Sequence, residues 1–490
     1  GAYNQYGVYC MNKGDYNSAL GYFAAGLALG DTDAKKELMF NQACCYEYMY
    51  QFKTAYEKFG EYLELYPDDE AAMAELIDTA KDIEKVILIG VCTSENDDTE
   101  ESLDELEELV KTAGAVTLEK VIQNRDSVHP GTYIGTGKIE EVRELAEEIG
   151  ATGVVCDDEL SPAQLRNLES ELRMKVMDRT MVILDIFASR ATTSEGKIQV
   201  ELAQLKYRAA RLVGLRSSLS RLGGGIGTRG PGEKKLEMDR RLIHERIGQL
   251  KSELEEVKRH RDVIRKQREK AHTPVAAIVG YTNAGKSTLL NRLTDAGILA
   301  EDKLFATLDP TTRNLELESG QQIMLTDTVG FIRKLPHHLI EAFKSTLEEA
   351  KYADMILHVV DASNPQADEQ MFTVYETLQG LKVQDKPIIT VFNKQDRLEG
   401  IPVIRDFKAD YTVSISAKTK AGLGDLLETI EALLRQQKVY IEEVYPYSEA
   451  GKIQLIRKYG ELLEENYTEE GIQVTAYVPA DIYPQIVVNR

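Results

Sequence analysis

Long apolar runs are missing from this chain, and its cysteines are few. No apolar run approaches the roughly 20 residues that a membrane-spanning helix needs, so we expect a soluble protein. The five cysteines are odd in number and lack metal-ligand spacing, which argues against a disulfide framework and a cysteine-bound metal. The first residues contain neither the basic nor the apolar part of a secretory signal, so we expect the protein in the cytoplasm.

Length and charge set two further bounds. With 490 residues, 43% of them hydrophobic and 29% charged, the chain is too long for one hydrophobic core and predicts several globular domains. The formal net charge of −22 would repel nucleic acid if it were evenly spread. Any contact with nucleic acid therefore requires a locally basic region.

The first 84 residues have a helical pattern that repeats. Two stretches superimpose with a shift of 36 residues, which pairs Gly7 with Ala43, Tyr16 with Phe52, Ala19 with Ala55 and Phe23 with Phe59. Small residues where paired helices meet, with aromatic residues between them, resemble tetratricopeptide repeats. An ordinary helical hairpin would give a similar pattern. Since two repeats are fewer than the roughly three that such arrays need, we expect another helix or the next domain to cover them.

Residues 85–192 have the pattern of a small α/β domain with a mainly parallel sheet. Helical patterns separate four strand-like runs, which begin at Val86, Ala115, Gly153 and Val182. The stretch Gly135-Thr-Gly-Lys138 superficially resembles a phosphate loop but lacks the spacing of a Walker A motif. A glycine turn that opens a helix at Ile139 explains it at least as well.

Two long polar helical patterns follow in residues 193–272, separated by a glycine-rich stretch at 222–233. This predicts an antiparallel helical hairpin with an exposed tip. Basic residues surround the tip, namely Arg221, Arg229, Lys234 and Lys235. Between Lys258 and Lys270 the second helix carries seven basic residues against two acidic ones. A basic arm of this kind is suited to contact with the phosphates of nucleic acid. The simpler explanations are that the glycine-rich tip is a flexible turn and that the basic face of the helix is only solvated.

A phosphate-binding loop is predicted at residues 280–287. A strand-like run leads into Gly280-Tyr-Thr-Asn-Ala-Gly-Lys-Ser287, and an apolar helical pattern follows. Glycines let backbone N–H groups turn toward a β-phosphate, Lys286 offers a cation to the β- and γ-phosphate oxygens, and Ser287 offers a hydroxyl to Mg²⁺. The motif alone fits ATP as well as GTP.

Two segments further along have the character of nucleotide switches. Asp327-Thr-Val-Gly330 offers a carboxylate for water-mediated contact with Mg²⁺ and the Gly330 N–H for the γ-phosphate. Thr307 lies between this segment and the phosphate loop in the sequence. It is placed to close over Mg²⁺ only when the γ-phosphate is present.

Base selection is predicted from Asn393-Lys-Gln-Asp396. The Asp396 carboxylate can accept from both the N1–H and the 2-amino group of guanine, an arrangement that adenine lacks. Ser414-Ile-Ser-Ala-Lys418 supplies a companion loop whose backbone N–H groups would face guanine O6. Five motifs in this fixed order predict GTP binding.

Hydrolysis is less directly encoded. Phe331 follows Gly330 at the position where Ras-like enzymes keep the glutamine that orients the attacking water, so slow intrinsic hydrolysis is expected. Asn283 resembles the asparagine that coordinates K⁺ in potassium-activated GTPases. A capping or turn role is the alternative for this residue.

Four further stretches strongly resemble the HflX family of GTPases, namely residues 184–190, 199–204, 225–233 and 305–310. The resemblance runs from about Lys85 to Arg490. It implies a GTPase of the Obg–HflX group that binds the large ribosomal subunit and splits ribosomes. It also implies that the glycine-rich loop enters ribosomal RNA near the peptidyl-transferase region. The expected rRNA contacts are then Arg221, Arg229, Lys234 and Lys235.

The resemblance also assigns the site residues by position. The expected nucleotide contacts are Gly280, Tyr281, Thr282, Asn283, Ala284, Gly285, Lys286, Ser287, Phe305, Ala306, Thr307, Leu308, Asp309, Asp327, Thr328, Val329, Gly330, Asn393, Lys394, Gln395, Asp396, Ser416, Ala417 and Lys418. Ser287 and Thr307 are the expected Mg²⁺ ligands, and Lys286, Thr307 and Gly330 are expected to act in hydrolysis. The family's N-terminal domain has been linked to ATP, but Gly135-Thr-Gly-Lys138 is too weak a motif to assign a second nucleotide site.

We therefore predict a multidomain α/β protein built around a P-loop GTPase domain. The expected parts are tetratricopeptide-like helices at 1–84, an α/β domain at 85–192, the hairpin at 193–272, the GTPase domain at 273–437 and a small α/β domain at 438–490. In the last part we expect strands at Val439 and Ile472 around a helix at 449–465, docking on the ribosome or the GTPase domain. The predicted function is a partly ribosome-associated, ribosome-splitting GTPase. The alternative is a GTP-dependent adaptor that recruits a protein through its repeats.

Overall fold

The computed structural model describes residues 1–30, 34–93, 98–219, 231–271, 273–294, 304–305, 308, 310–318, 320–335, 339, 349–383, 385–398, 404–436, 438–480 and 482–487. The side chains of residues 81, 212–219, 231–239, 258 and 262–271 also lie outside the described part. The chain forms two compact units, Gly1–Ile186 and Phe187–Arg490. Within the described part, no helix is both long and apolar enough to cross a membrane.

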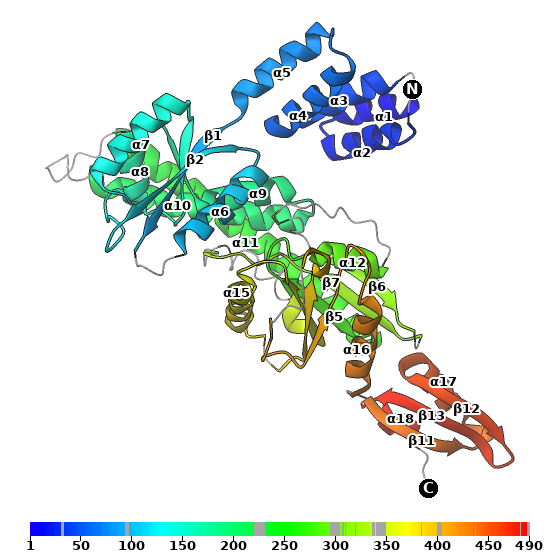
Figure 1. Cartoon of the computed structure of the whole chain (residues 1–490). Coiled ribbons are helices and arrows are strands. Elements are labelled where there is room, and N and C mark those ends of the chain that lie inside the picture. The colour runs from blue at the N-terminus through cyan, green and yellow to red at the C-terminus, as the bar shows by residue number, and fades with distance from the viewer. Residues whose placement is uncertain are drawn as a thin grey trace. The chain divides into compact units, whose positions relative to one another are not determined.

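The first unit begins with five helices, shown in blue in Figure 1. They are α1 (Ala2–Asn12), α2 (Tyr16–Leu27), α3 (Lys35–Tyr48), α4 (Phe52–Leu65) and α5 (Glu70–Asp82). Consecutive helices pack on one another around small and aromatic residues, and Ala19, Phe23, Ala55 and Phe59 are fully buried. A Cβ on Gly7 would come within 2.3 Å of the Phe23 ring, so the close approach of α1 to α2 requires glycine. The helices are present where expected, and their assignment as tetratricopeptide repeats stays a prediction.

A small parallel sheet completes the first unit. Its strands are β1 (Lys85–Cys92), β2 (Val116–Asn124), β3 (Gly153–Cys156) and β4 (Lys175–Asp178), in the order β2-β1-β3-β4. The connecting helices are α6 (Thr99–Thr112), α7 (Thr136–Ile149) and α8 (Pro162–Leu172). Buried apolar strands flanked by amphipathic helices produce this α/β arrangement, as the sequence predicted.

The strand expected at Val182 is wrong. Residues Arg179–Arg190 form helix α9, and the fourth strand is the shorter run just before it. Val182, Ile183, Ile186 and Phe187 are all buried. Their spacing puts them on one face of a helix, and Asp185 between them is exposed. The dense apolar run therefore fits a largely buried helix as well as a strand.

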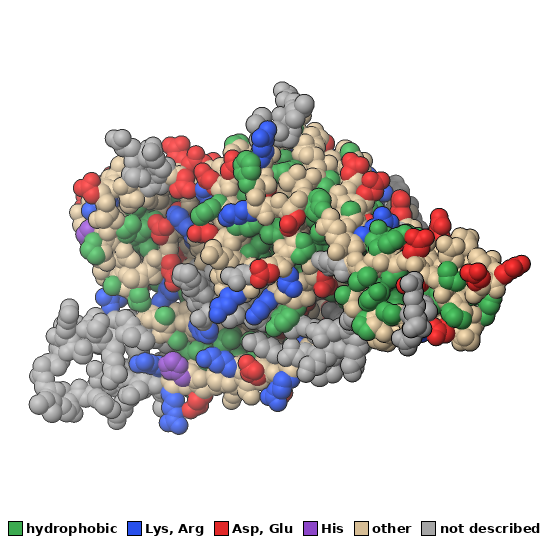
Figure 2. All heavy atoms as spheres, turned by 90° about the horizontal axis from the view of Figure 1, so that it is seen from below, with side chains coloured by type: hydrophobic (Ala, Val, Ile, Leu, Met, Phe, Trp, Pro, Cys, Tyr) green, Lys and Arg blue, Asp and Glu red, His purple; other side chains and the backbone are tan. Residues whose placement is uncertain are grey.

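The second unit opens with the predicted helical hairpin, made of α10 (Ser194–Leu219) and α11 (Pro231–Ala271). The two helices pack through a seam of apolar side chains, namely Leu202, Ala209, Ile247, Leu250 and Leu254. Figure 2 shows Lys and Arg side chains gathered along the lower margin of one face of the molecule, beside atoms drawn in grey. An acidic chain thus has a locally basic surface.

A six-stranded sheet forms the centre of the second unit. Its strands are β5 (Val275–Gly280), β6 (Thr311–Glu316), β7 (Gln322–Asp327), β8 (Met355–Asp361), β9 (Ile388–Asn393) and β10 (Tyr411–Ser414), in the order β10-β9-β8-β5-β7-β6. Only β6 runs antiparallel to its neighbour. The described helices around this sheet are α12 (Lys286–Thr294), α15 (Ala367–Gly380) and α16 (Leu423–Gln436).

The C-terminal part is a three-stranded antiparallel sheet with a helix on it. Its elements are β11 (Lys438–Tyr445), α17 (Ala450–Tyr459), β12 (Glu461–Thr468), β13 (Gly471–Pro479) and α18 (Tyr483–Ile486). The expected helix at 449–465 was too long, because the chain leaves the helix at Gly460 and pairs with β13. A Cβ on Gly460 would lie 2.6 Å from the carbonyl oxygen of Tyr477, so glycine permits this abrupt change of direction.

Candidate functional site

Loops at one edge of the six-stranded sheet carry the predicted nucleotide motifs. Strands β5, β7, β8, β9 and β10 are parallel, so the segments that follow them leave the sheet at the same edge. The phosphate loop follows β5, Asp327 ends β7, Asn393 ends β9 and Ser416 follows β10. The topology thus brings together four motifs that lie far apart in the sequence.

Close packing requires glycine at two positions of the phosphate loop. A Cβ on Gly280, which has a φ of +156°, would lie 2.2 Å from the carbonyl oxygen of Val359. A Cβ on Gly285, which has a φ of +96°, would lie 2.3 Å from Nδ2 of Asn393. Both positions therefore exclude a side chain. This tight course is what a loop that surrounds a phosphate group requires.

The ammonium group of Lys286 lies inside the phosphate loop rather than in solvent. Its Nζ donates to the carbonyl oxygen of Tyr281 at 2.8 Å, and the residue is 6% exposed. Burial lowers the pKa of Lys286 to about 8, against the opposing effect of Asp327. A carbonyl oxygen is a weaker partner for a cation than a phosphate oxygen, so an incoming phosphate can replace it.

Ser287 and Asp327, two of the three residues predicted to lie near Mg²⁺, are hydrogen-bonded to each other. Ser287 Oγ donates to Asp327 Oδ2 at 2.8 Å, and Asp327 is buried. Oxygen ligands of this kind suit Mg²⁺, which keeps much of its coordination shell for water and phosphate oxygens. Among the described residues, no cluster of three or more His, Cys, Asp or Glu side chains is arranged for a metal. Because Mg²⁺ takes many of its ligands from water and phosphate, two protein oxygen groups fit an ion that arrives with a nucleotide.

The segment after β7 is hydrogen-bonded to the phosphate loop. The Thr282 N–H donates to the carbonyl oxygen of Phe331 at 2.8 Å, and the Phe331 N–H donates to that of Gly280 at 3.1 Å. A Cβ on Gly330 would lie 2.9 Å from Thr282 Cγ2 and 3.0 Å from Lys286 Nζ. Glycine at position 330 therefore lets the segment approach the loop. The Phe331 side chain is buried and apolar, so it cannot orient a water molecule.

The predicted base-recognition residues are also held in place. Asn393 Nδ2 donates to the carbonyl oxygen of Ala284 at 2.9 Å, and its Oδ1 accepts from the Ala417 N–H at 3.0 Å. Ser416 Oγ donates to Asp396 Oδ1 at 2.6 Å, and this hydrogen bond holds the pKa of Asp396 below its usual value. The result is an ionised and oriented carboxylate, as guanine recognition requires.

Most other predicted residues lie at the same edge. Thr328 Oγ1 donates to the carbonyl oxygen of Ile278 at 2.8 Å, and Lys394 Nζ pairs with Asp361 at 2.8 Å. Asn283 is exposed and has a φ of +59°, a conformation that suits a turn. The remaining ones are Val329, which is buried, Gln395, which begins a short 3-10 helix, and Lys418, which is exposed in the loop after β10.

The first switch segment is described in part. Phe305 and Leu308 are buried, whereas Ala306, Thr307 and Asp309 lie outside the described residues. The Phe305 ring packs edge to face against that of Phe187, with centroids 4.8 Å apart and an interplanar angle of 80°. Sequence reasoning missed this role of Phe187, although the stretch that contains it was one of those that carried the family resemblance.

The predicted rRNA contacts lie outside what the structure describes. This holds for Arg221 and Arg229 and for the side chains of Lys234 and Lys235. Nearer the GTPase sheet, Arg261 of α11 pairs with Glu195 of α10 and lies 3.6 Å from Glu349. The hairpin therefore has a contact of its own with the segment that precedes β8.

At the carboxyl edge of the smaller sheet, the stretch from Gly135 to Lys138 opens α7. The Gly135 N–H donates to Gln123 Oε1 at 2.8 Å, and Lys138 Nζ pairs with Glu141 at 2.8 Å. Both groups therefore have partners within their own domain. This geometry fits the glycine turn rather than a phosphate loop.

A buried ion network lies at that same edge. Arg179 is 1% exposed and donates to Asp157 Oδ1 at 2.7 Å and to Glu105 Oε1 at 2.6 Å. It also donates to the carbonyl oxygen of Ser102 at 2.8 Å and to that of Asp157 at 3.1 Å. Ser102 Oγ donates to the second carboxylate oxygen of Asp157 at 2.7 Å. These groups satisfy one another within the domain.

Comparisons with known proteins agree with this geometry. Residues 275–394 match a family described as 50S ribosome-binding GTPase, and residues 100–188 and 190–268 match the N-terminal and middle regions of GTP-binding GTPases. The GTPase HflX of Lacrimispora saccharolytica is 72% identical over 417 residues, which cover 85% of this chain and 99% of that protein. The GTPase HflX of Caldanaerobacter subterraneus subsp. tengcongensis is 51% identical over 403 residues, which cover 82% and 93%.

A crystal structure of a GTP-binding protein from Sulfolobus solfataricus in complex with GDP is 26% identical. The match covers 72% of this chain and 99% of that one, with a TM-score of 0.40. Fold, site and sequence matches together define a P-loop GTPase, an enzyme that binds and hydrolyses GTP. Within that class, the chain belongs to the HflX family. The matched family regions begin at residue 100, after the five N-terminal helices.

Proposed function

We propose that this GTPase binds the large ribosomal subunit, that the subunit stimulates its GTP hydrolysis, and that the GTP cycle separates ribosomal subunits. Membership of a family described as 50S ribosome-binding supports the first step. The local basic charge of α11 in an otherwise acidic chain supports contact with RNA phosphates, and Arg221, Arg229, Lys234 and Lys235 are the proposed rRNA contacts.

The observation that best supports a coupled cycle is the ring contact between Phe187 and Phe305. Both side chains are at most 2% exposed, and Thr307 follows Phe305 by two residues. A switch that closes over Mg²⁺ must therefore rearrange beside the helix that leads into the hairpin. The contact between Arg261 and Glu349 is a second link between hairpin and GTPase sheet. Nucleotide state and hairpin position would then influence each other.

GTP binding, in this proposal, exchanges internal partners for phosphate oxygens. Lys286 leaves the carbonyl oxygen of Tyr281 and contacts the β- and γ-phosphates. Ser287 and Thr307 would hold Mg²⁺ when it is bound, and Asp327, which now accepts from Ser287, would orient a water beside it. When bound, Mg²⁺ neutralises negative charge on the β- and γ-phosphates. The Gly330 N–H meets the γ-phosphate.

The glutamine that orients the attacking water in Ras-like enzymes is replaced by Phe331 here. Phe331 provides no polar atom, so we propose that the ribosome completes the arrangement and that hydrolysis without it is slow. K⁺ bound with the help of Asn283 would supply further positive charge, and the exposure of Asn283 leaves room for this. Equal turnover in K⁺ and Na⁺ buffers would exclude this role of K⁺.

The decisive experiment compares GTP turnover with and without purified large subunits. We expect stimulation by the subunit, loss of that stimulation in Arg229→Glu, and little change in Lys251→Glu. The second variant reverses an exposed charge on α11 away from the tip and serves as the matched control. Light scattering of intact ribosomes with GTP should fall in parallel as subunits separate. If large subunits leave the rate of GTP turnover unchanged, the proposal is rejected, and the alternative of a GTP-dependent adaptor that recruits a protein partner is favoured.

A further inference from the structure

The N-terminal helices expose an unusual share of apolar surface. Half of the large hydrophobic side chains that are exposed in the described part lie in the first 84 residues, and most of these are tyrosines. Tyr50 is the most exposed of these, at 82%. Its φ of +58° is a conformation that glycine or asparagine adopts more easily, so a bulky ring is held there at a cost. Exposed apolar surface of this extent is typical of an interaction site.

The net charge of this region is strongly negative. Residues 1–84 contain fifteen acidic side chains, six lysines and no arginine. Four carboxylates from two helices form what we call the acidic row, namely Glu47 of α3 with Glu75, Asp78 and Asp82 of α5. Burial and then the charges of the other three raise the pKa of Glu47. A row of mutually repelling carboxylates is stabilised by an added cation and repels the phosphates of nucleic acid.

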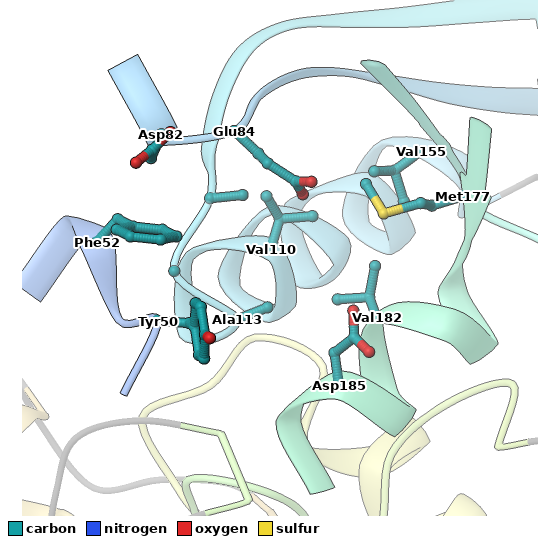
Figure 3. Close-up of a pocket in the computed structure, with 12 residues that line it drawn as sticks. Tyr50, Phe52, Asp82, Glu84, Val110, Ala113, Val155, Met177, Val182 and Asp185 are labelled. Atoms are coloured by element: carbon teal, nitrogen blue, oxygen red, sulfur yellow. The ribbon is translucent and has the colours of Figure 1, made fainter. Parts of the chain in front are cut away.

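A cavity of about 210 Å³ adjoins the end of this row. Tyr50 of the turn between α3 and α4 and Phe52, the first residue of α4, line one side. The α/β domain provides apolar side chains that include Val110, Met177 and Val182. Asp82 of the acidic row, together with Glu84 and Asp185, also lines it. Figure 3 shows the Glu84 carboxylate pointing into the space between Val110 and Met177, with Asp185 beside Val182. The cavity thus combines apolar walls with carboxylates.

The size of this cavity decides what can enter it. Pockets for small-molecule ligands usually hold roughly 300–1,000 Å³, so this one is too small for a nucleotide or a typical cofactor. One long side chain is a better match. The aliphatic stem of a lysine or arginine would lie against the apolar walls, and its charged end would meet carboxylates.

We propose that the acidic row and the adjoining cavity form a docking surface for a lysine- and arginine-rich polypeptide segment. One basic side chain of that segment enters the cavity, and its basic neighbours lie along Glu47, Glu75, Asp78 and Asp82. The exposed Tyr50 ring covers the inserted stem. The surface is made of residues of the first unit and the nucleotide site of residues of the second, and the proposal does not rest on the ribosomal role proposed above.

The test uses the full-length chain and a fluorescein-labelled dodecapeptide of alternating lysine and serine, with binding followed by fluorescence anisotropy. The double variant Glu47→Lys/Asp82→Lys should weaken binding by about tenfold or more, because it places like charges across the interface. Tyr50→Asn should weaken it by about threefold, since it removes the ring while suiting the backbone conformation. Glu64→Lys, an exposed charge reversal on α4, is the matched control and should change binding by less than about twofold.

Several results would overturn the proposal. One is unchanged peptide affinity in the double variant while GTP turnover confirms a folded protein. Another is an equal loss in Glu64→Lys, which would show that only net charge matters. Equal binding of a glutamate–serine peptide or of oligouridylate would exclude a site for basic polypeptides. If spermidine competes at the same concentration as the peptide, the site takes small amines instead.

Discussion

Two wholly or mainly parallel sheets of this protein place charged side chains at the carboxyl edges of their parallel strands, and these side chains have different roles. In the smaller sheet, Arg179 makes five hydrogen bonds to Asp157, Glu105 and Ser102, all within the domain. In the GTPase sheet, Lys286 has one described hydrogen bond, to the carbonyl oxygen of Tyr281. Both cations are buried. Burial alone therefore does not distinguish a ligand site from a structural ion network.

The difference lies in whether the partners can be exchanged. Arg179 is bound to two carboxylates, and taking it from them would leave uncompensated charges in the protein interior. Lys286 gives up only a neutral carbonyl group when a phosphate arrives. A buried cation whose internal partner is only a neutral carbonyl group can therefore bind an anionic ligand. A buried cation that is already paired with carboxylates stabilises the fold instead.

The largest effect is expected for Arg179→Met. Removing the guanidinium leaves Asp157 and Glu105 without their cation, and breaking such a buried pair typically costs about 3–5 kcal/mol of unfolding free energy. Urea denaturation followed by circular dichroism measures the loss. Arg143→Met, at a half-buried position on α7, should cost far less. Nucleotide affinity should stay unchanged in any Arg179→Met protein that remains folded.

Lys286→Ala should do the reverse of Arg179→Met, impairing the reaction with GTP while leaving the stability of the fold nearly unchanged. We expect GTP turnover to fall by about 10²–10³-fold, as for other single groups that stabilise transition-state charge, with little change in urea stability. Lys138→Ala, in the glycine turn of the smaller sheet, is the matched control and should leave turnover intact. Comparable losses in both variants would mean that the smaller sheet also contributes to the nucleotide reaction.

The pH dependence of nucleotide binding should report the exchange at Lys286 directly. Its pKa of about 8 in the free protein is below the ordinary 10.5, and a bound phosphate favours the charged form. Binding therefore takes up a proton above pH 8, and affinity for GDP should fall by up to about tenfold per pH unit there. Fluorescent GDP titrations between pH 7 and 9.5 measure this. In Lys286→Arg only the ionisation of guanine itself should remain.

The smallest effect is expected for Phe187→Leu, on the helix that begins at Arg179. Aromatic pairs contribute about 0.5–1.5 kcal/mol beyond area burial, so ribosome-stimulated turnover should fall by about threefold to tenfold. Turnover without ribosomes should change less. Phe372→Leu, at an exposed position on α15, is the control. A larger drop in the intrinsic rate would mean that the contact shapes the nucleotide site rather than coupling it.

The motifs of the nucleotide edge can be recognised in the sequence because each is local, and the contacts of their residues with GTP stay predictions. The phosphate loop, with Gly280, Lys286 and Ser287, can be recognised from a stretch of eight residues. The topology of the sheet then brings this loop and the other motifs to the same edge. The strand predicted at Val182 failed because a dense apolar run does not distinguish a buried helix from a buried strand.

Contacts between distant segments could not be predicted in the same way. The pairing of Phe187 with Phe305 depends on how α9 packs against the first switch segment, and no local pattern encodes it. The closed network around Arg179 similarly joins residues from three separate segments. The end of α17 at Gly460 is set by pairing with β13 rather than by the helical pattern, which continues past it.

The ring contact between Phe187 and Phe305 has a thermodynamic consequence. If closure of the first switch biases the hairpin, then whatever holds the hairpin must bias the switch by the same free energy, because linkage between two binding sites is reciprocal. The factor by which GTP tightens binding to the large subunit would then equal the factor by which the subunit tightens binding of GTP. Hydrolysis would remove that shared factor, so the ratio of GTP to GDP affinity on the subunit sets how strongly each hydrolysis event favours release.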